Sequence, residues 1–146
     1  LARGLGGPGG SRLNLVCQVY LALLSTYHLA SGVLSFFFGE AALRFYKAFY
    51  GTDPVERRHL LLILKPWGAL SICVGLAGWS AVPDPARHRG VVLAILVLLL
   101  LRITYRVAQH RELMAVSRVS WKHNAQNLCL LAAGVAVLVA WLGWAA

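Results

Sequence analysis

Four long apolar runs, separated by short polar connections, dominate the sequence. The runs cover about residues 13–38, 60–82, 86–107 and 126–144. About 20 consecutive apolar residues form an α-helix long enough to cross the hydrocarbon core of a bilayer. The pattern therefore predicts an all-α fold, an integral membrane four-helix bundle that forms a single domain over residues 13–146. We expect the glycine-rich residues 1–12 to be a flexible N-terminal leader.

The segment between the first two runs, residues 40–50, has a different pattern. Its apolar and aromatic residues recur at helical spacing: Ala42, Phe45, Tyr46 and Phe49. Arg44 and Lys47 lie off that stripe. Such a segment is typical of a short amphipathic helix that lies in the membrane interface. Gly51 is the expected end of this helix.

Helix-start signals precede three of the four spans. Asp53 to Glu56 forms a capping box with a proline at the first helical position. Asp84 and Pro85 repeat this start before the third span, and Ser120 is a suitable N-cap for the fourth. We expect a tight hairpin between the second and third spans, a kink at Pro66, and a third helix that continues unbroken toward Arg118.

Composition and charge support a membrane location. Of the 146 residues, 59% are hydrophobic and 13% charged, which is too little charge to cover a soluble globule. The net charge of +9 is distributed unevenly. Nine cations lie in or beside the first and third connections: Arg44, Lys47, Arg57, Arg58, Arg102, Arg106, Arg111, Arg118 and Lys122. Four lie in the N-terminal segment and the second connection: Arg3, Arg12, Arg87 and Arg89.

This distribution predicts topology, because cytoplasmic loops carry the excess of lysine and arginine. The first and third connections are expected on the cytoplasmic face and both termini on the other face, in a membrane that the sequence does not specify. Every basic cluster adjoins a span, so we expect contact with anionic lipid headgroups and no binding of nucleic acid. Tryptophans near the span ends fit interfacial belts: Trp67 and Trp121 at one face, Trp79, Trp141 and Trp144 at the other.

One polar stripe runs along the first span at intervals of three, four and seven residues: Gln18, Ser25, His28, Gly32 and Ser35. An ionisable residue near the middle of a span, here His28, is a candidate functional residue. It could handle protons, ligate haem or a metal, or contact a quinone or sterol headgroup. The interpretation we favour is a neutral imidazole that hydrogen-bonds to a neighbouring helix. The sequence requires no cofactor, and haem or quinone near His28 is an alternative.

Several basic residues are candidates for contact with lipid headgroups or with a partner: Arg44, Lys47, Lys65, Arg102 and Arg106. Lys65 is expected to extend to the interface beside Trp67. Arg102 and Arg106 are four residues apart and share one face of the third helix, which suits phosphate binding. The phosphate would belong to a lipid headgroup, and an acidic partner subunit is the alternative.

No catalytic or metal-binding set is recognisable. The five acidic residues fall in connections or helix starts: Glu40, Asp53, Glu56, Asp84 and Glu112. The cysteines, Cys17, Cys73 and Cys129, match no metal or redox spacing and are expected to be buried. The sequence therefore does not predict an enzyme.

Two ridges of small residues are expected to pack helices closely. One lies in the second span, Ser71, Gly75 and Gly78, and the other in the fourth, Ala132, Ala136, Ala140 and Gly143.

The layout of residues 13–145 resembles small four-helix membrane families, the DoxX-like proteins and the sterol-biosynthesis scaffold family. The resemblance rests on the segment Phe45-Tyr46-Lys47-Ala48-Phe49-Tyr50-Gly51 and on the order of the spans. It implies a protein that organises others in a membrane or a small subunit of a redox assembly.

The leading functional prediction is thus a non-catalytic accessory or scaffold subunit of a larger membrane complex. Such a subunit would pack through its small-residue ridges and its apolar third helix, with other membrane subunits or with its own copies. The alternative is a cofactor-, quinone- or lipid-binding protein, such as an oxidoreductase subunit, that uses the polar stripe of the first span. A small transporter is the third option.

Overall fold

The computed structural model describes residues 8–52 and 57–145. These residues form six helices and no strand: α1 (Pro8–Phe37), α2 (Gly39–Tyr50), α3 (Arg57–Ala81), α4 (Arg89–Ala108), α5 (His110–Ser117) and α6 (Trp121–Trp144). Four of them, α1, α3, α4 and α6, are long and apolar enough to cross a membrane. The prediction of an all-helical chain with four candidate spans is confirmed, and insertion into a bilayer remains a prediction.

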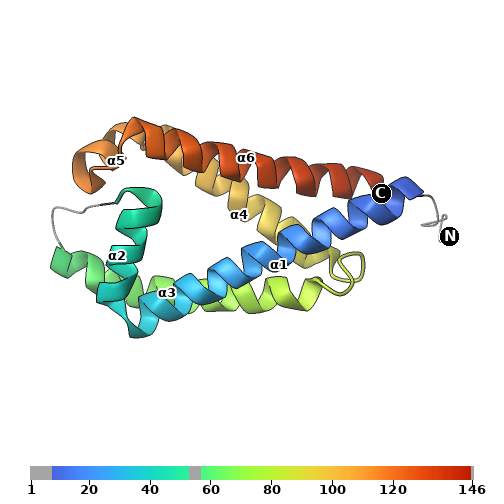
Figure 1. Ribbon diagram of the computed structural model, residues 1–146, viewed down its shortest axis with the longest axis horizontal. Helices are drawn as coiled ribbons and strands as arrows, with labels where there is room; N and C mark the ends of the chain where they lie inside the picture. The colour runs from blue at the N-terminus through green and yellow to red at the C-terminus, as the bar shows by residue number, and fades with distance from the viewer. Residues whose placement is uncertain (1–7, 53–56, 146) are drawn as a thin grey trace.

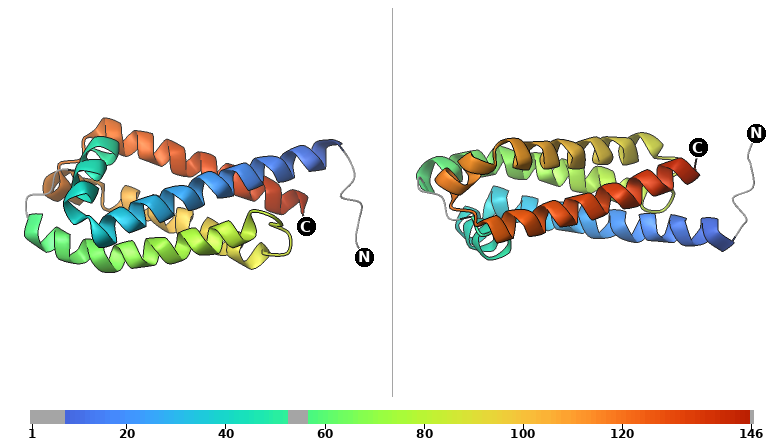
Figure 2. Two further views of the ribbon diagram at one scale, coloured as in Figure 1. Left: turned by 60° about the horizontal axis from the view of Figure 1, so that its bottom comes forward. Right: turned by 90° about the horizontal axis from the view of Figure 1, so that it is seen from above.

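The four long helices run along the long axis of the molecule, and the start of α1 and the end of α6 lie at the same end of it (Figure 1). Helices α1 and α3 lie side by side, and α6 lies along α4 (Figures 1 and 2). The short helices α2 and α5 gather at the end opposite the termini, where α2 crosses the end of the bundle. Helices α3 and α4 form the expected hairpin. The α3–α4 hairpin thus joins the pair α1–α3 to the pair α4–α6 at one end of the bundle, and α2 and α5 lie at the other end.

Glycines bring α1 and α3 into backbone contact. A Cβ atom at Gly68 would lie 2.7 Å from the backbone nitrogen of Phe36, and one at Gly32 would lie 2.8 Å from that of Ile72. At Gly75 a Cβ atom would lie 2.9 Å from the carbonyl oxygen of Ser25. Backbones that approach so closely leave no room for a side chain, which is how small residues pack membrane helices.

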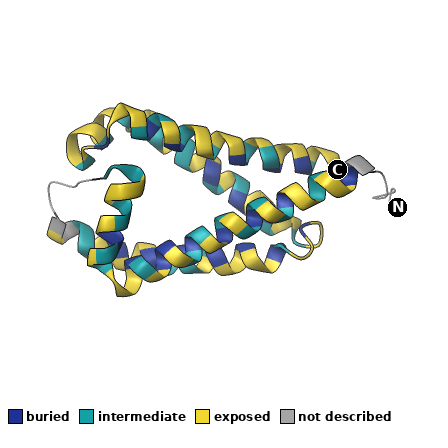
Figure 3. Cartoon of the chain, viewed as in Figure 1, coloured by how far each residue is buried: buried dark blue, intermediate teal, exposed yellow. Residues whose placement is uncertain are grey.

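An apolar cluster joins α1 to α4 and α6. Its buried members include Cys17 and Leu21 of α1, Leu99 of α4, and Leu138 and Trp141 of α6. Outside these seams the long helices expose large apolar side chains along most of their length (Figure 3). Apolar surface on this scale favours contact with lipid or with other subunits.

Most helix ends follow the sequence signals. Gly51 ends α2 in the left-handed conformation (φ 67°), and its N–H bonds to the carbonyl of Lys47. The hydroxyl of Ser120 accepts a hydrogen bond from the N–H of His123 and caps α6. The capping box at Asp53–Glu56 lies outside the described residues.

Three boundaries differ from the expectation. Helix α1 begins at Pro8, inside the expected leader, because proline suits a first turn and Gly10 fits closely against Trp144. The carboxylate of Asp84 accepts from the N–H of Arg87 and closes a separate turn, so α4 begins only at Arg89. The helix of the third span was expected to continue unbroken toward Arg118. Instead α4 ends at Ala108, and after Gln109 the helix α5 takes a new direction.

Candidate functional site

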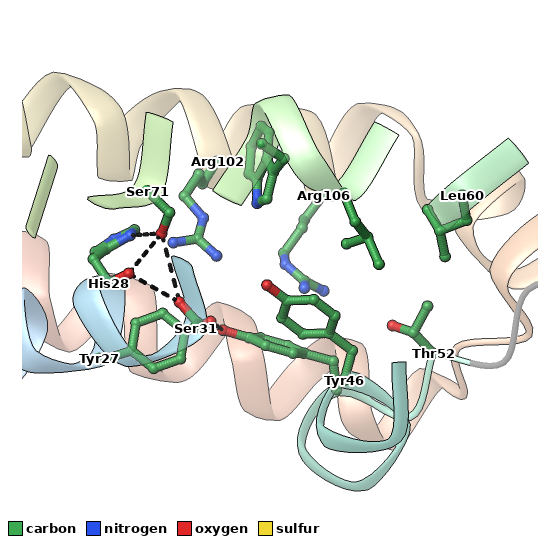
Figure 4. A pocket seen from close by; sticks show the side chains of 12 residues that line it. Tyr27, His28, Ser31, Tyr46, Thr52, Leu60, Ser71, Arg102 and Arg106 are labelled. Atoms are coloured by element: carbon green, nitrogen blue, oxygen red, sulfur yellow. Dashed lines mark hydrogen bonds between the residues drawn. The ribbon is translucent and has the colours of Figure 1, made fainter. Parts of the chain in front are cut away.

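A polar chamber of about 190 Å³ lies between α1, α3, α4 and α2, at the end of the bundle where α2 and α5 gather (Figure 4). Its walls carry hydroxyl, imidazole and guanidinium groups from helices that are distant in sequence. The polar lining side chains are those of Tyr27, His28, Ser31, Tyr46, Tyr50, Thr52, Ser71, Arg102 and Arg106. Leu60, Leu64 and Trp67 of α3 complete the lining, and we call this cavity the arginine chamber.

His28 is held by the neighbouring helix α3. Its Nδ1 lies 3.0 Å from the hydroxyl oxygen of Ser71, and that hydroxyl donates to the carbonyl oxygen of His28 at 3.0 Å. Because a serine hydroxyl has a single proton, Nδ1 must be the donor in the first bond. Nδ1 therefore carries a proton, and the other ring nitrogen is Nε2. That atom is buried and has no hydrogen-bond partner among the described residues.

Two tyrosines of α2 extend this network. Ser35 donates its hydroxyl proton to the carbonyl of Ser31 at 2.7 Å, so the Tyr46 hydroxyl, also 2.7 Å from Ser35 Oγ, is the donor to it. Burial raises the pKa of Tyr46, which keeps its phenol protonated. The hydroxyl groups of Tyr27 and Tyr50 are hydrogen-bonded to each other. Hydroxyl groups of α1, α2 and α3 thus form a connected part of the chamber wall.

Arg102 and Arg106 supply the positive charge of the chamber. Both guanidinium groups extend from α4 into it (Figure 4). Arg106 donates to the side-chain oxygen of Asn124 at 2.9 Å and lies over the ring of Tyr50, 5.5 Å from its centroid. None of the described lining residues is acidic, and Asp53 and Glu56 lie outside the described residues. Two half-buried cations thus face a cavity whose described walls hold no carboxylate.

The structure distributes the predicted polar stripe along the α1–α3 seam. His28 and Ser35 belong to the network around the chamber. Gly32 lies against α3, and the Gln18 amide donates to the carbonyl of Pro83 at 3.0 Å, far from the chamber. Ser25 is buried beside Gly78, and its hydroxyl has no hydrogen-bond partner among the described residues. The stripe is thus a packing seam with His28 and Ser35 at the chamber.

The basic candidates separate into two groups. Arg44, Lys47 and Lys65 are exposed on the outer faces of α2 and α3. Arg102 and Arg106, in contrast, turn toward the chamber, although they were expected to face headgroups or a partner. Arg106 is held in this direction by Asn124 of α6 and by the Tyr50 ring of α2.

The two ridges of small residues also differ. Ser71, Gly75 and Gly78 face α1 across the close α1–α3 contact. The ridge of α6 (Ala132, Ala136, Ala140 and Gly143) is exposed, so it packs against none of the described helices. The buried residues of α6 lie on another face and include Asn127, Gly134, Leu138 and Trp141. On that face the Trp141 indole donates to the side-chain oxygen of Asn14 at 3.2 Å, and Tyr20 packs against Gly134.

Sequence reasoning did not identify Tyr27, Tyr50 and Asn124 as site residues. For Asn124 the available signal was the polar stretch over residues 122–127 at the start of the fourth span. Tyr27 and Tyr50 carried no signal beyond their places next to His28 and Gly51. Asn124 connects Arg106 to His110, because its amide nitrogen lies 3.2 Å from Nδ1 of that histidine. No periodicity within one helix points to such a cross-helix relay.

Metal binding finds no support in the described part of the chain, where no three His, Cys, Asp or Glu side chains come together. Cys17 is buried, as expected, whereas Cys73 and Cys129 are exposed, so the expectation of burial is wrong for these two.

The sequence matches no protein family, and comparisons with curated proteins and with solved structures give no match. The resemblance to the small four-helix families therefore remains one of layout.

Proposed function

We propose that this protein is a multi-pass membrane protein that binds a small anionic group, a phosphate or a carboxylate, in the arginine chamber. The observation that carries the proposal is the inward direction of Arg102 and Arg106, into a cavity whose described walls contain no acid. Guanidinium groups bind phosphates and carboxylates through paired, charge-assisted hydrogen bonds. This is the ligand-binding alternative of the sequence analysis, moved from His28 to the arginines.

The depth of the arginines supports this role. Helix α4 has 20 residues, about 30 Å at ~1.5 Å per residue. Arg102 precedes Ala108, the last residue of that helix, by six positions, or roughly 9 Å. If α4 spans the bilayer, Arg102 lies within its apolar layer, where an ionised side chain is costly and points to a functional role.

The surroundings of the chamber also favour an anion. The end of the bundle that holds it carries further exposed cations: Arg44, Lys47, Arg111, Arg118 and Lys122. Such a concentration of positive charge raises the local concentration of anions and speeds their association. In the hydrogen-bonded pair of Tyr27 and Tyr50, one hydroxyl keeps a proton that it can donate to an anion without adding charge.

Titration calorimetry of the full chain in neutral detergent, with inorganic phosphate and with acetate, tests the proposal. A charged hydrogen bond contributes about 1.5–3 kcal/mol, so Arg102→Gln and Arg106→Gln should each weaken binding roughly tenfold or more. Arg89→Gln, at the exposed first position of the same helix α4 and away from the chamber, is the matched control and should bind as the unchanged protein does. Equal affinity in all variants, or no binding of either anion, would refute the proposal.

An accessory or scaffold role is the second candidate, and the exposed ridge of α6 favours it. Ala136→Leu should disrupt complexes that form through this ridge, whereas Ala133→Leu, exposed but off the ridge, should not. Cross-linking in native membranes measures both. Identical cross-linking patterns would count against contact through the ridge.

A further inference from the structure

A second cavity adjoins the arginine chamber. It has a volume of about 330 Å³ and lies between α1, α4 and α6, with α2 at one end. Most of its wall is apolar. Leucine side chains form one part of it and the aromatic rings of Tyr20 and Phe49 another; the leucines are Leu23, Leu24, Leu99, Leu130 and Leu131. Leu23 and Leu130 are largely exposed, so the cavity is an open groove on the apolar side of the bundle. We call it the leucine groove.

Four residues line both the leucine groove and the arginine chamber: Tyr27, Tyr50, Arg102 and Arg106. The hydrogen-bonded hydroxyls of Tyr27 and Tyr50 form part of the wall between the two spaces. Arg106 lies over the Tyr50 ring at this wall. The cationic groups therefore stand at the point where an apolar groove meets a polar chamber.

This juxtaposition restricts the ligand, and the inference that follows rests on the proposed anion binding. We propose that the protein binds an anionic amphiphile, a molecule with a phosphate or carboxylate headgroup on a single hydrocarbon chain. The headgroup pairs with Arg102 and Arg106, and the chain occupies the leucine groove. A chain there buries its methylene groups against leucine side chains, while the headgroup neutralises the two cations.

The size of the two spaces favours one chain. Pockets for small molecules have volumes of roughly 300–1,000 Å³, and the leucine groove is near the lower limit. The arginine chamber, at about 190 Å³, has room for a compact headgroup. A free anion would leave the groove without a role, and a cationic amphiphile would meet two like charges.

Native mass spectrometry of the full chain in a neutral detergent tests the inference with defined probes. The probes are dodecyl phosphate, dodecanoate, dodecyltrimethylammonium, dodecanol and inorganic phosphate. We expect one bound dodecyl phosphate or dodecanoate per chain, with at least tenfold less binding of dodecyltrimethylammonium and dodecanol. The stronger of the two anionic probes shows whether a phosphate or a carboxylate is preferred.

Two groups of variants distinguish binding of the headgroup from binding of the hydrocarbon chain. The double variant Arg102→Gln/Arg106→Gln should reduce amphiphile binding at least tenfold. Leu24→Trp, which fills the groove from its wall, should do the same while inorganic phosphate still binds. Leu15→Trp, exposed on the same helix and outside both cavities, is the matched control and should bind as the unchanged protein does. If Leu24→Trp fails to fold, the exposed Leu23→Trp serves the same purpose.

The outcomes are distinguishable. Inorganic phosphate that binds as well as dodecyl phosphate, together with unaffected binding in the groove variants, would overturn the inference and leave anion binding in place. Equal binding of the cationic and anionic probes would also overturn it, because the groove would then hold any chain. Failure of every anion to bind, with no effect of the arginine variants, would remove the inference and the proposed function together.

Discussion

The close contact between α1 and α3 makes a sharp prediction about Gly75. In Gly75→Ala the new Cβ atom would lie 2.6 Å from Cγ of Leu29 and 2.9 Å from the carbonyl oxygen of Ser25. Because two of the neighbours, the nitrogen of Leu29 and this carbonyl oxygen, are backbone atoms, the helices must separate by some tenths of an ångström. Overpacking of this kind costs about 1–3 kcal/mol.

The same substitution also has a favourable component. Alanine is a better helix former than glycine by about 0.8–1.0 kcal/mol. We therefore expect Gly75→Ala to lower the free energy of unfolding by up to about 2 kcal/mol. Gly143→Ala is the matched control, because a Cβ atom there has no neighbour within 4 Å. That variant should be unchanged or slightly stabilised.

The assay is reversible unfolding in mixed micelles, followed by helical circular dichroism. A second readout comes from the site, since Ser71 lies on α3 between Gly68 and Gly75 and bonds to His28 at 3.0 Å. Separation of the helices should lengthen this bond and change the ¹⁵N chemical shift of His28 Nδ1. If Gly75→Ala is as stable as the unchanged protein and leaves that shift in place, the close α1–α3 contact is wrong.

Three further predictions concern single residues and topology. Ser71→Ala removes the acceptor of His28 Nδ1 and should lower the free energy of unfolding by about 0.6–1.7 kcal/mol in micelle denaturation. Gly51→Ala places a side chain at φ 67°, where alanine is strained, and this side chain also crowds His123. Amide exchange near the end of α2 should therefore be faster, and unchanged exchange would contradict the cap. The charge distribution predicts both termini on the non-cytoplasmic face, so tags at the termini should resist protease in inside-out vesicles and be cleaved only if the topology is reversed.

The long elements could be predicted because hydropathy and helix length depend on local sequence alone. The end of α2 at Gly51 and the cap at Ser120 are equally local, and both are confirmed. The break at Gln109 carries no glycine or proline, so nothing in the sequence indicated it.

The candidate site was less predictable, because it depends on contacts between helices. The spacing of Arg102 and Arg106 placed them on one face, but only Tyr50 of α2 and Asn124 of α6 explain why that face turns inward. Trp141 shows the same limit. It fits an interfacial anchor by its position, yet it is buried because its indole meets Asn14 of α1.

The two arginines also connect stability with binding. Like charges four residues apart on a helix repel each other, and partial burial strengthens that repulsion. An anion that binds only the folded chain removes it and adds stability of RT ln(1 + [L]/Kd), about 2.7 kcal/mol at a hundredfold excess over Kd. Replacing Arg102 by glutamine should therefore raise stability without ligand and lower it when ligand is abundant. A residue that stabilises the fold only in the bound state belongs to a binding site, whereas a purely structural arginine would give the same change under both conditions.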